Sequence, residues 1–207
     1  SISVFSYNPQ DKKVVILDIP LETYLEVPHG FGKWQLRAVY DLGQSQEGGG
    51  GVLLKETLNN FLGLPIDGFL DFEGPFKESS AGELLESLRE NPVSSFKMLT
   101  HLHSDLSLWE LIRLKLALLL LRFDKIEKRA ILDLEVLEQD KLADGTQIFL
   151  SDPVRLDSAL SSFAEPKLFK EHQSIAIFNA TNHPQLAQKA ARIITNIGGN
   201  VIITANW

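Results

Sequence analysis

The segment ISVFSYNPQDKKVVILDI, residues Ile2–Ile19, predicts the start of a β-sheet. Ile2–Tyr7 alternates apolar and polar residues with a period of two, which is typical of a strand. Lys13–Ile19 is rich in β-branched and apolar residues and predicts a buried strand. Because Asn8–Lys12 is a cluster of turn residues, we expect these two strands to form a hairpin. We also expect Thr23–Val27 to extend the same sheet.

A glycine run, Gly48–Gly51, separates this strand region from a segment with helical spacing. Val52–Leu62 carries apolar residues three and four positions apart, and Gly63 should end the helix. We interpret the glycine run as a mobile loop. The alternative is a phosphate cradle formed by backbone N–H groups, although the run lacks the G-K-[ST] ending of a P-loop.

Further strand-like and helical segments follow in the central part of the chain. Ser107-Leu108-Trp109-Glu110 fits a capping box, which predicts a helix from there to about Phe123. We interpret the apolar run Leu116–Leu121 as part of a buried core helix, with a lipid-facing stripe as the alternative. The remaining expected elements are strands at Ile66–Phe72 and Arg129–Val136 and helices at Ala81–Arg89 and Asp157–Phe163.

The end of the chain predicts a βαβ unit. Ser174–Asn179 and Asn200–Ala205 read as strands, and a helix between them should begin near Pro184. We therefore expect an α/β fold, with a mixed central sheet flanked by helices and a small C-terminal βαβ module. The expected division is a first domain at 1–163, a linker at 164–173 and the βαβ module at 174–207. The module has a thin core, so we expect it to lean on the first domain or to be incomplete.

Composition excludes several function classes. The net charge of −7 and the isoelectric point of about 5.2 argue against a general nucleic-acid binder, which needs a basic face. The absence of cysteine excludes disulfides, thiolate metal sites and a cysteine nucleophile. The longest apolar run is far shorter than the roughly 20 residues that span a bilayer. Because the chain opens inside a strand pattern without a signal peptide, we expect it to be part of a longer protein.

Four segments, taken in order, resemble the LytR-CpsA-Psr family of cell-envelope proteins. The first is Ile2–Pro28, with N-P-x-x-K between two strands and I-P-L-E-T-Y after the second. The second is Ala38–Gly74, with A-x-Y, the glycine run and LGLPIDGFLDFEG, and the third is Asp105–Gly145. The fourth, Ile175–Ile203, is similar to the LytR C-terminal domain. The resemblance implies an extracytoplasmic α/β protein of the bacterial cell envelope, with a membrane anchor before Ser1 in the full-length protein.

Members of this family transfer glycopolymers from a polyprenyl pyrophosphate carrier to peptidoglycan, using basic residues for the pyrophosphate and carboxylates for a divalent metal. The chain departs from that pattern where the chemistry needs charge. The family's arginine falls on Leu21, its aspartate on Glu22 and a lysine on Gln35. The arginine-rich stretch is also missing, since Pro75–His103 contains only three basic residues, Lys77, Arg89 and Lys97. Leucine cannot replace a guanidinium that holds phosphate oxygens in two hydrogen bonds.

From the resemblance we expect a degenerate member that binds a polyprenyl-phosphate-linked glycopolymer, peptidoglycan or another wall partner without catalysis. We expect no catalytic residue, no metal site and no nucleic-acid partner. The candidate ligand-binding residues are Arg37, in the place of a family asparagine, and Lys33, on the same segment. An ordinary surface arginine is the alternative for Arg37.

Two other functions stay open. One is an active phosphotransferase, for which Mg²⁺ or Mn²⁺ would be the cofactor. The other is a metal hydrolase of the PHP type, because His101-Leu102-His103 places two imidazoles on one face of a strand. Such hydrolases need several more ligands, and only His172 and His183 follow, so we expect no metal at this pair.

Overall fold

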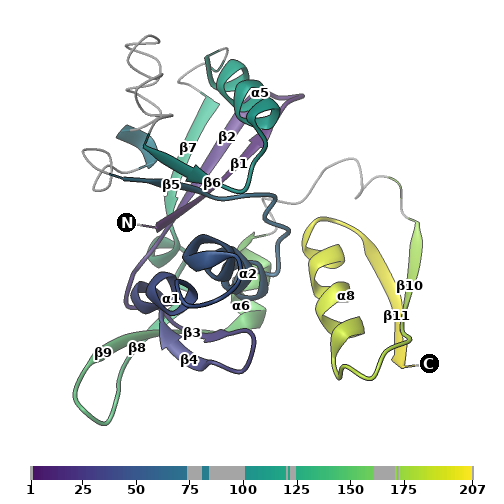
Figure 1. The fold of residues 1–207 in the computed structure, drawn as a ribbon. Helices are drawn as coiled ribbons and strands as arrows, with labels where there is room; N and C mark the ends of the chain where they lie inside the picture. Colours follow the sequence, from purple (N-terminus) through teal and green to yellow (C-terminus); the bar gives the residue numbers. More distant parts are fainter. Residues whose placement is uncertain are drawn as a thin grey trace.

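The computed structural model describes residues 2–73, 81–83, 101–119, 121, 125–160, 171 and 173–206. Strands and helices are interspersed along the chain, as expected for an α/β fold (Figure 1). The strands are β1 (Ile2–Asn8), β2 (Lys13–Ile19), β3 (Tyr24–Val27), β4 (Gly32–Gln35), β5 (Leu70–Phe72), β6 (Leu102–Ser104), β7 (Ile126–Ala130), β8 (Leu137–Lys141), β9 (Gln147–Ser151), β10 (Ser174–Asn179) and β11 (Asn200–Asn206). The helices are α1 (Leu36–Gly43), α2 (Gly49–Leu62), α5 (Leu108–Leu119), the 3-10 turn η3 (Ile131–Leu134), α6 (Pro153–Ala159) and α8 (Leu186–Asn196).

A mixed sheet in the order β1-β2-β7 forms the centre of the first region. β1 and β2 form the predicted antiparallel hairpin, with Ile2 opposite Ile19 and Asn8 opposite Lys13. β7 joins β2 in parallel, although more than a hundred residues separate them. The central strand is the most deeply buried, which explains its run of apolar residues. The expectation of a mixed sheet flanked by helices is therefore confirmed.

The prediction that Thr23–Val27 extends this sheet is wrong. Thr23 N donates a hydrogen bond to the Pro20 carbonyl oxygen at 3.1 Å, so the chain turns away from the first sheet at Pro20. β3 then pairs with β4 in a separate antiparallel hairpin. The turn between them places His29 and Gly30 at positive φ, 62° and 83°. The local strand pattern was right, but the partner strand was not the expected one.

The glycine run is not a mobile loop, because α2 begins at Gly49 inside it. A Cβ atom on Gly50 would lie 2.4 Å from the Tyr40 carbonyl oxygen of α1, and one on Gly51 would lie 2.3 Å from the Phe69 ring. These glycines therefore allow α2 to approach its neighbours more closely than any side chain would permit. Gly63 ends the helix at φ 61°, as predicted.

Other boundaries differ from the sequence predictions. The strand predicted at Arg129–Val136 ends at Ala130, where η3 begins. β5 is shorter than predicted and α6 begins earlier, at Pro153, where the Asp152 carboxylate accepts from two backbone N–H groups. Most of the helix predicted at Ala81–Arg89, and most of the linker predicted at 164–173, lies outside the described residues, so the domain division stays a prediction.

α5 begins at the predicted capping box. Ser107 N donates to Glu110 Oε2 at 2.8 Å, and Glu110 N donates to Ser107 Oγ at 3.3 Å. The prediction that this helix is buried is wrong, because no residue of α5 is buried. One stripe rests on the sheet while another faces solvent. Among the described residues, no helix is long and apolar enough to cross a membrane.

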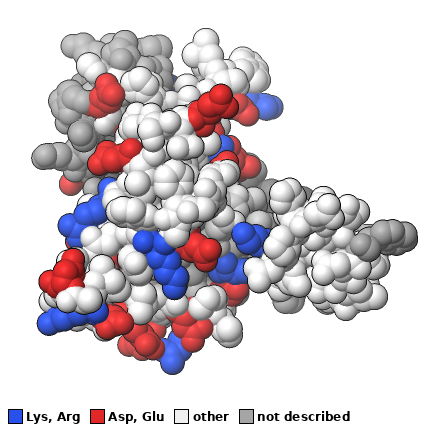
Figure 2. Space-filling model, turned by 60° about the horizontal axis from the view of Figure 1, so that its bottom comes forward, with Lys and Arg blue, Asp and Glu red and all other residues white. Residues whose placement is uncertain are grey.

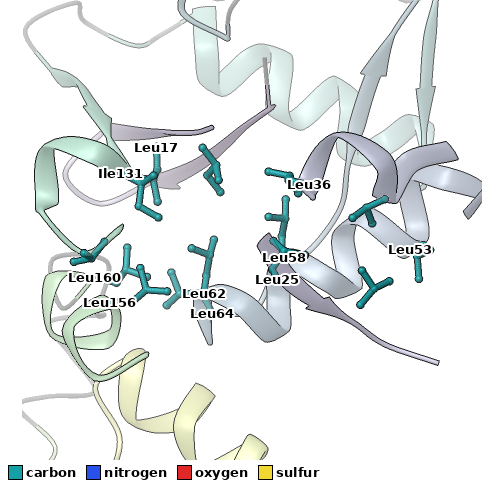
Figure 3. Packing of buried hydrophobic residues seen from close by; sticks show 14 residues of the cluster. Leu17, Leu25, Leu36, Leu53, Leu58, Leu62, Leu64, Ile131, Leu156 and Leu160 are labelled. Carbon is teal, nitrogen blue, oxygen red and sulfur yellow. The ribbon is translucent and has the colours of Figure 1, made fainter. Parts of the chain in front are cut away.

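The main hydrophobic core lies between the sheet, α1, α2 and α6. Figure 3 shows side chains from these elements, such as Leu17, Leu36, Leu62 and Leu156, directed toward a common interior. All four are fully buried. The core thus joins the start of α1, where the candidate ligand residues lie, to the central strand.

The C-terminal region forms the predicted βαβ unit, with β10 and β11 parallel and α8 between them. It contacts the first region through a polar network. Arg192 of α8 donates two hydrogen bonds, at 2.7 and 2.9 Å, to the Asn60 and Phe61 carbonyl oxygens at the end of α2. It also pairs with Asp157 of α6, with Arg192 Nη2 2.7 Å from Asp157 Oδ1.

Asn196, one turn further along α8, completes the network. Its Nδ2 donates to the Gly63 carbonyl oxygen at 3.1 Å and to Asp157 Oδ1 at 3.0 Å. We call Arg192, Asn196 and Asp157 the clamp. The last carbonyl groups of a helix have no partner within it, and they carry partial negative charge that favours a cation. Arg192 and Asn196 supply hydrogen-bond donors to these carbonyl groups, and Arg192 also supplies the positive charge. The expectation that the small unit packs on the first region is therefore confirmed.

Candidate ligand site at the start of helix α1

The candidate ligand residues lie where β4 runs into α1. Leu36 N donates to the Thr23 carbonyl oxygen at 2.8 Å, and Arg37 N donates to the Leu21 carbonyl oxygen at 3.0 Å. These bonds tie the segment after Pro20 to the first turn of α1. The structure therefore brings Leu21 and Glu22 next to Arg37, although the sequence separates them by about one strand hairpin.

Arg37 is paired with an acid. Its Nη2 lies 3.1 Å from Glu22 Oε1, and the side chains are 50% and 41% exposed. A surface ion pair of this kind contributes about 0–1 kcal/mol, so a stronger anion can displace it. Any phosphate that reaches Arg37 must nevertheless compete with the Glu22 carboxylate. The guanidinium is therefore present at the site but partly neutralised.

Lys33 and Gln35 point from the same face of β4, because they are two residues apart on one strand. Lys33 stands opposite Glu26 of β3 and is exposed. Gln35 Nε2 donates to the Gln147 carbonyl oxygen of β9 at 3.0 Å, which ties this face to the β8–β9 hairpin. Each candidate basic residue thus has a carboxylate beside it. The ligand-binding role of Lys33 and Arg37 stays a prediction.

The start of α1 is a poor anion site by itself. A helix begins with four N–H groups that lack helical partners. At α1 the first two of these, from Leu36 and Arg37, already bond to backbone carbonyls. Phosphate binding here would have to rely mainly on side chains.

Thr23 was treated only as a strand residue in the sequence analysis, but it holds an unusual position. It is fully buried, and its Oγ1 has no hydrogen-bond partner among the described residues. Its backbone carries the turn that precedes the candidate site. Nothing in the local sequence indicated that this hydroxyl would be enclosed.

A second polar cluster joins α1 to β5 and β6, and the sequence analysis singled out only His103 from it. Tyr40 Oη donates to Asp71 Oδ2 of β5 at 2.5 Å. This hydrogen bond, together with burial and the Asp71 charge, raises the pKa of Tyr40 to about 12. Asp71 of β5 lies directly opposite His103 of β6 in the strand register. The His103 Nε2 atom lies 3.4 Å from Glu73 Oε1.

Asp105 anchors the start of the α5 segment to α2. It forms an ion pair with Lys55 and accepts a hydrogen bond from Phe69 N at 2.9 Å. Burial opposes its charge, but the bonds from Lys55 and Phe69 outweigh burial and lower the pKa of Asp105. These acids and bases pair with one another, which identifies them as structural contacts.

The His101 and His103 pair is not part of a ligand cluster. Within the described residues, no three His, Asp or Glu side chains are grouped as metal ligands. His103 lies in β6 beside Glu73, and His101 precedes the strand. His172 lies outside the described residues.

The surface charge near the α1, β3 and β8–β9 end is mixed. Figure 2 shows lysine and arginine side chains interleaved with aspartate and glutamate on this face, without one broad basic patch. The ion pairs Arg37–Glu22 and Arg155–Glu138 are examples of this pairing. Such a surface suits a small anionic group bound at one point better than an extended polyanion.

No protein-family model matches the sequence, and no curated protein matches it. Solved structures do match it. A transcriptional regulator from Enterococcus faecalis superimposes with a TM-score of 0.56 and 11% identity, covering 77% of this chain and 79% of that chain. YwtF from Bacillus subtilis gives 0.56 and 15%, covering 74% and 79%. TagT bound to LI-WTA gives 0.54 and 14%, also covering 74% and 79%.

These identities are low, so the comparisons establish the fold. TagT and YwtF are structures of LytR-CpsA-Psr proteins. The matches cover about three quarters of this chain. The chain described here therefore has the fold of the LytR-CpsA-Psr proteins.

Proposed function

We propose that this chain is an extracytoplasmic cell-envelope protein that binds a polyprenyl-phosphate-linked wall precursor, or another wall partner, without transferring the glycopolymer. The observation that carries the proposal is the LytR-CpsA-Psr fold combined with a site that holds one neutralised arginine. The fold supports the ligand class, and the site supports the absence of transfer.

The ligand class comes from the structural neighbours. TagT has been seen bound to LI-WTA, and YwtF, the same protein, with octaprenyl pyrophosphate. By analogy, the ligand of this chain would carry a phosphate group on a polyprenyl chain. The Arg37 guanidinium is the candidate partner for that phosphate, with Lys33 on the adjoining strand.

The absence of transfer rests on charge. Pyrophosphate is a multiply charged group, and phosphoryl transfer depends mostly on positioning and on stabilising charge. Here Leu21 has no charge, Gln35 is bonded to the Gln147 carbonyl oxygen, and Arg37 is paired with Glu22. A site with so little free positive charge can hold a phosphate weakly, but it lacks the groups that would stabilise a transition state.

Calorimetric titration with a short-chain polyprenyl phosphate tests the binding proposal. We expect weak, salt-sensitive binding that Arg37→Ala weakens about tenfold or more, the loss of one charge-assisted hydrogen bond. Arg155→Ala is the matched control, because Arg155 is also an exposed arginine paired with a glutamate, at 3.2 Å. Absence of binding at millimolar ligand, or equal weakening by both substitutions, would remove the phosphate role.

A turnover assay tests the second half of the proposal. A polyprenyl pyrophosphate-linked donor and peptidoglycan fragments are incubated with the protein and Mg²⁺ or Mn²⁺. We expect no product above the protein-free blank. Metal-dependent product formation would instead identify an active phosphotransferase.

A further inference from the structure

The outward stripe of α5 is an apolar feature of the described surface that the proposed function does not use. It consists of Leu108, Ile112, Leu116 and Leu119, spaced by four, four and three residues, with Trp109 alongside. These side chains are between 38% and 71% exposed. We call them the α5 stripe.

The opposite side of the helix explains why the stripe stays outside. Leu118 packs against Val14 and Ile16 of the central strand. The helix therefore rests on the sheet with one face and cannot turn the α5 stripe inward. Figure 1 places α5 at one end of the molecule, away from the β8–β9 hairpin and α8. The stripe is thus a fixed, outward-facing feature.

Charge on this helix favours an anionic apolar surface. Arg113 is exposed beside the stripe, next to Trp109 and Leu116 on the helix face. Glu110 is the only acid of α5, and its carboxylate accepts hydrogen bonds from both Ser107 N and Ser107 Oγ. Leucine with tryptophan on one face and basic residues at its border is typical of a helix that lies in a membrane interface.

The size of the stripe argues against a second copy of the chain as its partner. α5 has 12 residues, which gives a helix about 18 Å long and about 10 Å wide. One such face is well short of the roughly 800 Å² per partner that a stable protein interface buries. A lipid surface has no such threshold, because each apolar side chain inserts independently.

We infer that the α5 stripe is a membrane-contact surface, which inserts its leucines and Trp109 between lipid head groups while Arg113 meets their phosphates. The binding is peripheral, and it is independent of the polyprenyl ligand. It would hold this end of the protein, with α5 and the central sheet, against the lipid surface.

Vesicle flotation with phosphatidylglycerol and phosphatidylethanolamine, without any polyprenyl lipid, tests this inference apart from the proposed function. The chain should float with the vesicles, and the double substitution Ile112→Glu with Leu116→Glu should weaken binding at least about tenfold. Val154→Glu with Leu186→Glu is the matched control, because both residues are exposed apolar positions on other helices. Both double variants should keep the circular dichroism spectrum of the parent.

Two further readouts locate the contact. Arg113→Gln should weaken binding about fivefold on phosphatidylglycerol vesicles and little on purely zwitterionic vesicles. Brominated phospholipids should quench tryptophan fluorescence, and Trp109→Phe should abolish most of the quenching. The inference is overturned if the chain does not float, if both double variants bind equally, or if light scattering shows a dimer that only Ile112→Glu with Leu116→Glu dissociates.

Discussion

The first region and the C-terminal βαβ unit are held together by different forces. The first region encloses a continuous core of fully buried leucines, isoleucines and valines between the sheet and three helices. The βαβ unit buries few side chains of its own, exposes Phe178, Ile202 and Ile203, and meets the first region through Arg192, Asn196 and Asp157. The larger region is therefore built by apolar burial, whereas the smaller one is placed mainly by specific hydrogen bonds, to which Ile197 adds an apolar contact with the edge of the main core.

The largest expected effect comes from the core. Leu17→Ala removes a fully buried side chain from the central strand and should lower the free energy of unfolding by about 2–5 kcal/mol. Ile202→Ala, in the exposed part of the βαβ unit, should change it by less than about 0.5 kcal/mol. Urea denaturation followed by circular dichroism measures both. Similar values for the two substitutions would contradict the contrast between the regions.

The second-largest loss of stability is expected from a substitution in the clamp. Arg192→Ala removes bonds from a guanidinium to Asp157 and to the last carbonyl groups of α2, and should lower stability by about 2 kcal/mol. Hydrogen exchange should accelerate in the last turn of α2 and in α8, while the central sheet remains protected. Lys189→Ala, an exposed position on the same helix, is the control. Unchanged exchange at the end of α2 would show that the clamp does not place the unit.

The hydrogen bond between Tyr40 and Asp71 tests how much a polar contact contributes inside the region that is built by apolar burial. Tyr40→Phe removes the hydrogen bond to Asp71 and should lower stability by about 1 kcal/mol at neutral pH. The pKa of Tyr40 is raised from 10.0 to about 12 by this bond, by burial and by the Asp71 charge. The folded state therefore favours the protonated phenol. The contribution of Tyr40 to the free energy of unfolding is complete below pH 10 and is lost as the pH rises toward 12.

Unfolding measurements between pH 8 and pH 12 check the sign of this effect. The parent should lose stability relative to Tyr40→Phe as the pH rises through this range, so the difference between them should shrink. Tyr24→Phe serves as a control for the loss of a phenol elsewhere. A difference that stays constant up to pH 12 would mean that the contact with Asp71 does not control the titration of Tyr40.

The smallest effect concerns the enclosed hydroxyl of Thr23. Thr23→Val has nearly the same shape and removes a buried hydroxyl that has no partner within the described part of the chain, so it should raise stability by up to about 1 kcal/mol. Thermal unfolding measures the change. A loss of stability would indicate that Thr23 Oγ1 forms a hydrogen bond when the protein is in solution.

The sequence by itself determined the elements whose signals are local. Alternation of apolar residues placed β1 and β2 and their hairpin, Gly63 ended α2, and the capping box started α5. The βαβ unit was also readable, since its strands and helix are consecutive. The order of several weak motifs indicated the fold, which the solved structures then established. Apart from that order of motifs, these features depend on residues close together in the chain.

Only the tertiary structure decided the features that depend on distant partners. The glycine run begins α2, and its glycines are needed because α1 and Phe69 lie too close to it for side chains. The partner of Arg37 is Glu22, which the turn at Pro20 brings to it, and the clamp joins residues more than 130 positions apart. The outward direction of the α5 stripe depends on which face of the helix packs on β2. Periodicity shows that a helix has an apolar face, but the geometry of the whole chain determines whether anything covers it.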